Sequence, residues 1–212
     1  MELKTAKPKN KVNNAVLPVM EHFYTIQGEG VHSGSAAYFI RLAGCDVGCH
    51  WCDVKDSWDV TIHPVMKITD IVKHAKQSGA PIAVITGGEP TMHNLTELTA
   101  QLKKAGMAVH IETSGSSPLT GKFDWVCLSP KKLKAPLKEA FAKADELKVV
   151  IYNKDDFSWA EKNAAQVSKK CKLLLQPEWS KADKVMPMIV DYIKKHPRWQ
   201  VSLQTHKYMN IP

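Results

Sequence analysis

The sequence predicts an α/β fold, an incomplete (β/α) barrel with parallel strands. Short apolar runs alternate with segments of helical periodicity along most of the 212 residues, which is typical of a parallel sheet covered by helices. Unusual polar residues follow the apolar runs, and parallel sheets place their chemistry at the carboxyl ends of the strands. About seven strands with crossovers of this length favour the incomplete barrel over an eight-stranded one, while a flat doubly wound sheet would show the same alternation.

The first elements follow this order. Residues 37–42 form an apolar run that predicts a buried strand. Residues 68–78 predict a helix, because Ile71 and Ala75 share one face and Gly79 follows its end.

The remaining elements continue the alternation. Residues 94–105 predict a helix, because Leu95, Leu98 and Leu102 recur at helical spacing. Further strands are expected at residues 81–85, 107–111, 124–128, 147–151, 173–175 and 199–203. Further helices are expected near residues 137–144, 155–168 and 181–195.

The chain length suits one hydrophobic core, so residues 16–212 are expected to form a single domain. Residues 1–15 are expected to form a loosely ordered basic tail, because their lysines lie among Asn and Pro without hydrophobic periodicity. These lysines are Lys4, Lys7, Lys9 and Lys11.

The composition argues against nucleic acid and membrane as direct partners, and against a secreted protein. The formal net charge of +8 does not predict direct nucleic-acid binding, because much of it lies in this tail and in lysine pairs on solvated helix faces. No apolar stretch approaches the roughly 20 residues that a membrane helix needs. Five cysteines, an odd number without an apolar signal sequence, argue against a secreted disulfide framework and predict a cytoplasmic location.

Three cysteines follow the first predicted strand with the spacing Cys45-x3-Cys49-x2-Cys52. Three thiolates from one loop can hold three irons of a four-iron four-sulfur (4Fe-4S) cluster, and no fourth cysteine follows locally to bind the last iron. The spacing therefore predicts a cluster with one iron open to a ligand.

A structural zinc site is the alternative, in which His50, Cys127 or Cys171 completes a tetrahedron. Zinc sites usually take their ligands as two separated pairs, whereas three lie here in one loop. Cys127 and Cys171 lie in apolar stretches and are expected to fill the core.

Polar segments after successive strands would converge at one mouth of the barrel. Each alone is a weak signal, since Gly-Gly and Ser-Pro are common in turns. Beyond the cysteine loop, they are residues 86–90, 112–115, 129–131, 176–179 and 204–207.

The cysteine loop resembles the cluster loop of radical S-adenosylmethionine (SAM) enzymes, in which the open iron takes the amino and carboxylate groups of SAM. Residues 87–90, Gly-Gly-Glu-Pro, resemble the segment that holds the SAM amino group, and glycines let the backbone approach a ligand closely. The resemblance implies the modified radical SAM core as the fold. It also implies a cofactor site of Gly87, Gly88, Glu89, Glu112, Ser114, Ser129, Pro130, Lys131, Gln176, Pro177, Glu178 and Trp179. For Glu112 the alternative is a strand-end ion pair with a neighbouring lysine.

Residues 23–30, Arg41 and residues 204–212 resemble 7-carboxy-7-deazaguanine synthases, and the likeness covers nearly the whole chain. That family converts 6-carboxy-5,6,7,8-tetrahydropterin into 7-carboxy-7-deazaguanine with loss of ammonia, on the route to queuosine in tRNA, and is typically homodimeric. The resemblance implies a substrate site of Ile26, Gln27, Gly28, Glu29, Arg41, Thr86, His206 and Pro212.

The side chains suit this substrate. Gln27 and Glu29 match the polar edge of a pterin, and Arg41 can bind a carboxylate through two parallel hydrogen bonds. Two alternatives stay open, a structural pair of Arg41 with Glu29 or Asp46, and a simple glycine turn at residues 27–30.

The mechanism that the resemblance implies needs an external one-electron donor such as flavodoxin or ferredoxin. Its electron reduces the cluster, which cleaves SAM to methionine and a 5′-deoxyadenosyl radical. The radical would take a hydrogen atom from carbon 6 of the pterin, after which the ring contracts, SAM is regenerated and ammonia leaves. The protein would exclude water and hold the substrate near the radical.

One position departs from the family pattern. Relatives commonly have Cys-Asp-Thr where this chain has Cys52-Asp53-Val54, and that threonine hydroxyl binds magnesium beside the substrate. Valine offers no oxygen. Mg²⁺ could still bind the substrate carboxylate, waters and Asp53 or Asp56, or Lys55 could supply the positive charge instead.

A second function shares these cysteines. An activating enzyme that generates a glycyl radical on a partner protein would have the same cluster loop and glycine-rich strand end, but it would not need a pterin pocket.

Overall fold

The structure is a computed structural model that describes residues 15–212. Its strands are β1 (Val16–Ile26), β2 (Ala36–Leu42), β3 (Val65–Lys67), β4 (Ile82–Gly87), β5 (Ala108–Thr113), β6 (Trp125–Leu128), β7 (Glu146–Ile151), β8 (Lys172–Pro177) and β9 (Trp199–Val201). Its helices are α1 (Ile68–Gln77), α2 (Thr96–Lys104), α3 (Lys138–Lys143), α4 (Asp156–Ala164), α5 (Ala182–Lys195) and α6 (Thr205–Met209). Short 3₁₀ turns are η1 (Lys55–Trp58), η2 (Val60–Ile62), η3 (Pro90–Met92) and η4 (Trp179–Lys181).

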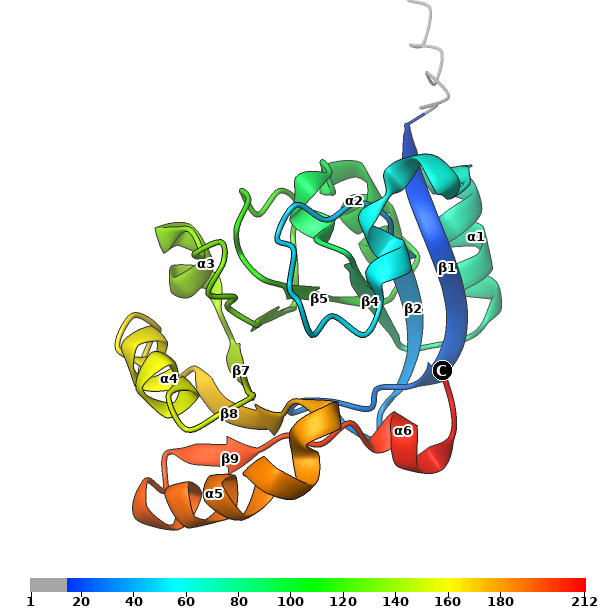
Figure 1. Cartoon of the computed structure of the whole chain (residues 1–212). Coiled ribbons are helices and arrows are strands. Elements are labelled where there is room, and N and C mark those ends of the chain that lie inside the picture. The colour runs from blue at the N-terminus through cyan, green and yellow to red at the C-terminus, as the bar shows by residue number, and fades with distance from the viewer. Residues whose placement is uncertain (1–14) are drawn as a thin grey trace, which may run out of the picture.

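The strands form one sheet in the order β3-β1-β2-β4-β5-β6-β7-β8-β9. From β2 to β9 all neighbours are parallel, whereas β1 is antiparallel to both β2 and β3. Within the described residues, no pairing joins the edge strands β3 and β9, so the barrel is incomplete. The sheet curves, with α1 to α5 outside it (Figure 1). The predicted fold class is confirmed.

The predicted elements after residue 36 are confirmed to within a few residues, because each strand and helix from β2 to β9 follows the periodicity of the sequence. Three elements were not predicted: β1, β3 and α6. β1 contains Pro18 and a run with Glu21 and His22, which lack the regular alternation of a half-buried strand. It extends the sheet on the side of β2 that is free of parallel partners.

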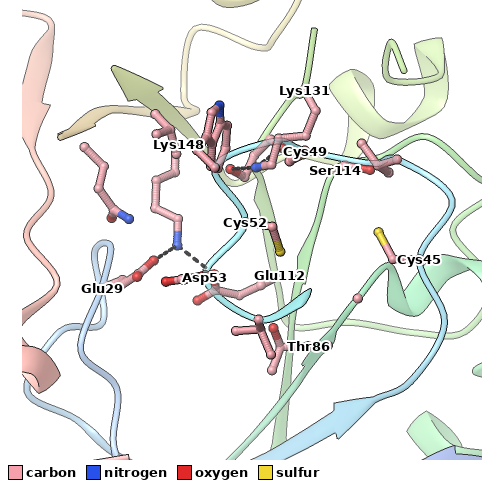
Figure 2. Close-up of a pocket in the computed structure, with 18 of the residues that line it drawn as sticks. Glu29, Cys45, Cys49, Cys52, Asp53, Thr86, Glu112, Ser114, Lys131 and Lys148 are labelled. Atoms are coloured by element: carbon pink, nitrogen blue, oxygen red, sulfur yellow. Dashed lines mark hydrogen bonds and ion pairs between the residues drawn. The ribbon is translucent and has the colours of Figure 1, made fainter. Parts of the chain in front are cut away.

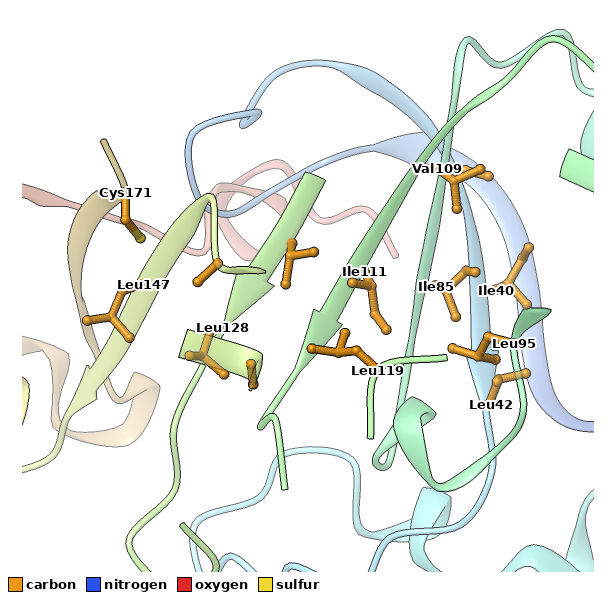
Figure 3. Packing of buried hydrophobic residues seen from close by; sticks show 14 of the residues in the cluster. Ile40, Leu42, Ile85, Leu95, Val109, Ile111, Leu119, Leu128, Leu147 and Cys171 are labelled. Carbon is orange, nitrogen blue, oxygen red and sulfur yellow. The ribbon is translucent and has the colours of Figure 1, made fainter. Parts of the chain in front are cut away.

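The two faces of the sheet differ in chemistry. On β7, Leu147, Val149 and Ile151 belong to the hydrophobic core under the helices. Glu146 and Lys148 alternate with them and are also buried, so they point to the concave face. Figure 3 shows core side chains of this kind from β2 through β7. Buried charged side chains of β7 therefore lie on the concave face of the sheet, whereas its apolar side chains pack under the helices.

Two further sequence expectations concern the N-terminal tail and membrane-spanning helices. The predicted tail lies outside the described residues apart from Ala15, whose carbonyl accepts a hydrogen bond from the Ile68 N–H. Among residues 15–212, no helix is long and apolar enough to span a membrane.

Candidate active site

A cavity of about 570 Å³ lies on the concave face at the carboxyl ends of the strands, within the size range of small-molecule sites. The predicted convergence at one mouth is thus present in the structure. Predicted residues that line it are Cys45, Cys49, Cys52, Gly87, Gly88, Glu89, Glu112, Ser114, Ser129, Lys131, Gln176, Pro177, Glu178 and Trp179, together with Glu29, Arg41, Thr86 and His206.

The other predicted residues do not line the cavity. Gln27 is buried and donates a hydrogen bond from Nε2 to Glu112 Oε1 at 2.9 Å. The Gly28 carbonyl accepts from the Thr205 N–H at 2.8 Å. Ile26, Pro130 and Pro212 also lie outside the lining, and the Pro212 carbonyl accepts from Thr25 Oγ1 at 3.5 Å.

The cysteine loop leaves β2 and is tied down by backbone hydrogen bonds. The Gly44 N–H donates to the Ser57 carbonyl at 2.7 Å, and the Cys45 N–H donates to that of Trp58 at 3.3 Å. Cys45, Cys49 and Cys52 carry free, partly buried thiols that face the cavity (Figure 2).

The chemistry of this donor set fits a cluster. Burial raises the pKa of the Cys45 and Cys49 thiols, and the positive charge of Lys131 acts in the opposite direction on Cys49. A bound metal centre would favour the thiolate forms, and three thiolates from one loop suit three irons of a 4Fe-4S cluster. Within residues 15–212, no three His, Cys, Asp or Glu side chains lie close enough to hold a single metal ion.

The zinc alternative required Cys127, Cys171 or His50 as a fourth ligand. Cys127 and Cys171 are buried, as predicted, and Cys171 belongs to the hydrophobic core. The His50 ring packs against Trp51 and Tyr152 and does not line the cavity. The structure thus brings none of these residues into the cavity beside the three loop cysteines.

The end of β4 packs backbone to backbone against the start of the cysteine loop. Gly87 has a φ of 142°, and a Cβ there would lie 2.0 Å from the Leu42 carbonyl oxygen. A Cβ on Gly88 would lie 2.4 Å from the Gly44 carbonyl oxygen and 2.8 Å from Cys45 Cβ. The two glycines, called the glycine cradle below, therefore let the strand end and the loop pack directly together, and a side chain at either position would clash with the loop backbone.

The Glu89 side chain is saturated by the protein itself. Its carboxylate accepts hydrogen bonds from Thr91 N and Oγ1, from Thr113 Oγ1 at 2.5 Å and from Ser114 N at 2.7 Å, and it also contacts Ser114 Oγ. It ties the end of β4 to the end of β5. The part of this segment that remains free to meet a ligand is its glycine backbone.

The cavity is also lined by a triad in which the buried Lys148 contacts the partly buried Glu29 and Glu112, and the sequence did not predict it as a unit. Lys148 Nζ lies 2.5 Å from Glu29 Oε2 and 2.6 Å from Glu112 Oε2 (Figure 2). Gln204 Nε2 donates to Glu29 Oε1 at 2.8 Å. The ion pair with a lysine, which was the alternative prediction for Glu112, is therefore present, and the lysine is Lys148.

The triad is charged. Burial opposes ionisation of Glu29, but the charge of Lys148 and hydrogen bonds to this carboxylate lower its pKa to about 2. Burial likewise disfavours the charged form of Lys148, yet the surrounding acidic groups raise its pKa well above the usual value. Glu29 and Lys148 are thus held in their ionised forms at neutral pH.

Arg41 lies on β2 directly opposite Glu21 on β1, and its Nε donates to Glu21 Oε1 at 2.6 Å. Its structural partner is therefore neither Glu29 nor Asp46, and Asp46 pairs with Lys134 instead. The Arg41 side chain still lines the cavity, so its terminal nitrogens can face a ligand.

Lys207 lies in the predicted polar segment 204–207, but its contacts were not predicted. It comes from α6, lies 3.1 Å from Asp53 Oδ2 and sits over the Trp179 ring at 4.8 Å from its centroid. Lys148 lay outside every motif, but it carried one signal, a charged residue at an alternate position of an apolar strand.

Comparisons with known proteins agree with this site. The model of the radical SAM superfamily matches residues 39–144, which include the cysteine loop and the glycine cradle. The chain is 59% identical over 197 residues to a 7-carboxy-7-deazaguanine synthase of Flavobacterium psychrophilum, covering 93% of each chain. It is 45% identical over 204 residues to that of Synechocystis sp., covering 96% of this chain and 98% of the relative.

A solved structure shares the fold. The crystal structure of QueE from Escherichia coli superimposes with a TM-score of 0.80 at 31% sequence identity, over 89% of this chain and 93% of the other. Because identity at these levels spans nearly the full length of the relatives, the chain belongs to the 7-carboxy-7-deazaguanine synthase family of the radical SAM superfamily.

Proposed function

We propose that the cavity is the active site at which this chain converts 6-carboxy-5,6,7,8-tetrahydropterin into 7-carboxy-7-deazaguanine with release of ammonia, in queuosine biosynthesis. One observation carries the proposal. The three-cysteine loop, the Gly87-Gly88 segment and the triad of Glu29, Lys148 and Glu112 all line a single cavity. A cofactor and a substrate can therefore meet there. Residues 16–212 would act as one catalytic domain.

The cofactor half uses the loop and the strand ends. Cys45, Cys49 and Cys52 would hold the 4Fe-4S cluster, and the exposed backbone of Gly87 and Gly88 would face SAM. When bound, cluster and SAM supply a 5′-deoxyadenosyl radical. Lining residues of the cofactor half would orient SAM through hydrogen bonds and apolar contact. They are Ser114, Ser129, Lys131, Gln176, Pro177, Glu178 and Trp179.

The proposed substrate half of the cavity has both negatively and positively charged side chains. Glu29 accepts from the N–H donors of the pterin edge, and Glu112 belongs with it because both contact Lys148. Arg41 binds the substrate carboxylate with its terminal nitrogens. His206 packs tightly against Gly28 and closes this side of the cavity, which excludes water from the reacting atoms.

The deciding experiment is an anaerobic turnover assay. Purified protein with reconstituted iron and sulfide, SAM, a reductant and carboxytetrahydropterin is expected to form the deazapurine, detected by mass spectrometry. Reductive cleavage of SAM without any deazapurine, together with transfer of a radical to a glycine of a partner protein, would instead support the activating-enzyme alternative.

Magnesium does not fit the residues present. Val54 offers no oxygen, and the adjacent Asp53 carboxylate is paired with Lys207. The other carboxylates of the lining are already bonded by protein donors. These carboxylates are Glu29, Glu89, Glu112 and Glu178. We therefore propose that Lys207 supplies the positive charge beside Asp53 and that turnover does not require the cation.

Magnesium independence is a direct prediction. Adding MgCl₂ to chelator-treated enzyme is expected to change kcat/KM for the pterin by less than about twofold, because the Asp53 carboxylate beside Val54 is already paired with Lys207. Lys207→Met is expected to raise KM, whereas Lys55→Met serves as the matched control, since Lys55 is exposed and does not line the cavity. An activation of about tenfold or more in the wild type would contradict the prediction.

The one-electron donor is proposed to be an acidic protein such as a flavodoxin or ferredoxin. The segment after β6 lies beside the cysteine loop, since Lys134 Nζ contacts Asp46 Oδ2 at 2.5 Å. Its strongly exposed Leu133 lies between Lys132, which pairs with Asp156, and Lys134, and this rim suits such a partner. A homodimer is proposed from the family resemblance and a cytoplasmic location from the cysteines, and light scattering of the purified protein tests the dimer.

A further inference from the structure

The triad links segments that are far apart in the chain. Glu29 comes from the loop between β1 and β2, Glu112 from β5 and Lys148 from β7. The Lys148 side chain is 3% exposed, and its only polar group reaches both carboxylates at 2.5 and 2.6 Å. An ammonium group at this depth is stable only with such partners.

The hydrogen bonds fix the orientation of both carboxylates. Each of the four carboxylate oxygens accepts one protein donor: Lys148 twice, Gln204 on Glu29 Oε1 and Gln27 on Glu112 Oε1. A carboxylate oxygen can accept a second hydrogen bond, so acceptor capacity remains on the side of the cavity. The triad is thus a pair of aligned acceptors rather than a closed ion pair.

The charges do not cancel. Two carboxylates and one ammonium leave a net charge of −1 at a partly buried position that borders the cavity. A ligand that places several N–H donors there satisfies the free lone pairs and offsets part of this charge. The fused aminopyrimidinone edge of a pterin carries such donors.

We propose that Lys148 is a positioning residue that holds Glu29 and Glu112 aligned as paired acceptors for the N–H edge of the pterin. The proposal rests on the proposed function and names the element that selects its substrate class. Lys148 does not itself touch the reacting atoms. It acts through the two glutamates, so its removal weakens binding of the pterin ring more than the chemical step.

The test measures binding of 6-carboxypterin, a fluorescent and unreactive analogue, as well as turnover. Lys148→Met is expected to raise the Kd for the analogue and the KM for the substrate by about tenfold or more, with a much smaller change in kcat. Lys172→Met is the matched control, because it makes the same substitution at an exposed position of the adjacent strand. It is expected to bind like the wild type.

The pH dependence separates positioning from simple structural support. In the wild type the pKa of Glu29 is lowered to about 2, so its carboxylate adds no slope to binding between about pH 6 and pH 8. Without Lys148, burial raises the pKa of Glu29, so binding weakens as pH falls and recovers as pH rises. Other titratable groups remain near position 148 in both proteins, and because Lys148 also lowers the pKa of His206, the two profiles are compared with His206→Gln present in both. The titratable groups near position 148 are Cys127, Lys131, Glu146 and His206.

A second pair of variants covers the possibility that Lys148→Met fails to fold. Glu112→Gln with Lys148→Met has the same net charge at the triad as the wild type, and thermal unfolding checks its stability. It is expected to bind the analogue several-fold more weakly than Glu112→Gln alone. Equal binding by these two folded variants would overturn the inference, as would a wild-type Kd and pH profile in Lys148→Met.

Failure of the proposed function has a different signature. If the wild type neither binds the pterin analogue nor forms the deazapurine, the function is wrong and the inference falls with it. If the wild type does both and the Lys148 variants match it, only the inference falls.

Discussion

Replacing Cys45, Cys49 or Cys52 with Ala is expected to abolish both cluster assembly and turnover. Each thiolate would hold one iron, and among residues 15–212 no further cysteine lines the cavity, because Cys127 and Cys171 are buried elsewhere. Iron and sulfide content, visible absorbance and deazapurine formation measure the effect. We expect activity to fall by at least about a thousandfold, to the background of the assay.

Cys171→Ala is the matched control for these variants. It removes a buried thiol of the hydrophobic core and is expected to cost about 1 kcal/mol of stability while iron content and turnover remain. A triple Ala variant of the loop that still made product would contradict the assignment. Stoichiometric zinc without iron in anaerobically purified wild type would do the same.

Gly88→Ala is expected to have the second-largest effect. Its Cβ would lie 2.4 Å from the Gly44 carbonyl oxygen, and backbone cannot move aside as a flexible side chain can. The end of β4 and the cysteine loop must then separate, which displaces Cys45 and the surface that faces SAM. We expect kcat/KM to fall by about a hundredfold or more, with weaker SAM binding and lower iron occupancy.

Gly79→Ala controls for the general cost of replacing glycine. Gly79 also has a positive φ, of 73°, but a Cβ there meets nothing within 4 Å. We expect it to lower stability by about 1 kcal/mol and to leave turnover unchanged. If Gly88→Ala behaved like Gly79→Ala, the close packing of loop and strand would not matter for activity.

The parallel part of the fold could be predicted from the sequence, because hydrophobic periodicity is a local signal. The strand β1 could not be predicted, and without it the ion-pair partner of Arg41 could not be identified. The partners considered for Arg41 were Glu29 and Asp46, whereas the actual partner is Glu21, which lies opposite it in the antiparallel pair. A cross-strand partner cannot be found until its strand is known.

The site residues that belong to contiguous sequence motifs were predictable. Those that meet only because they share the concave face of the sheet were not. The cysteine spacing and the Gly87-Gly88 segment are contiguous in sequence, so they could be recognised directly. Lys148 stands alone in an apolar strand, and its two partners lie 119 and 36 residues away along the chain. Lys55 was the lysine considered near Val54, yet the helix α6 brings Lys207 there instead.

The contact between residue 28 and residue 205 has a consequence for dynamics. The Thr205 N–H and hydroxyl both donate to the Gly28 carbonyl, and this link joins the substrate loop to the segment after β9, an edge strand with one neighbour. Edge segments open more readily than central strands. Transient release of this wall would let a bulky heterocycle enter and leave while the thiolate loop, anchored on β2 and β4, stays in place. Amide hydrogen exchange should therefore be fastest on this side of the cavity and should slow when the heterocycle is bound.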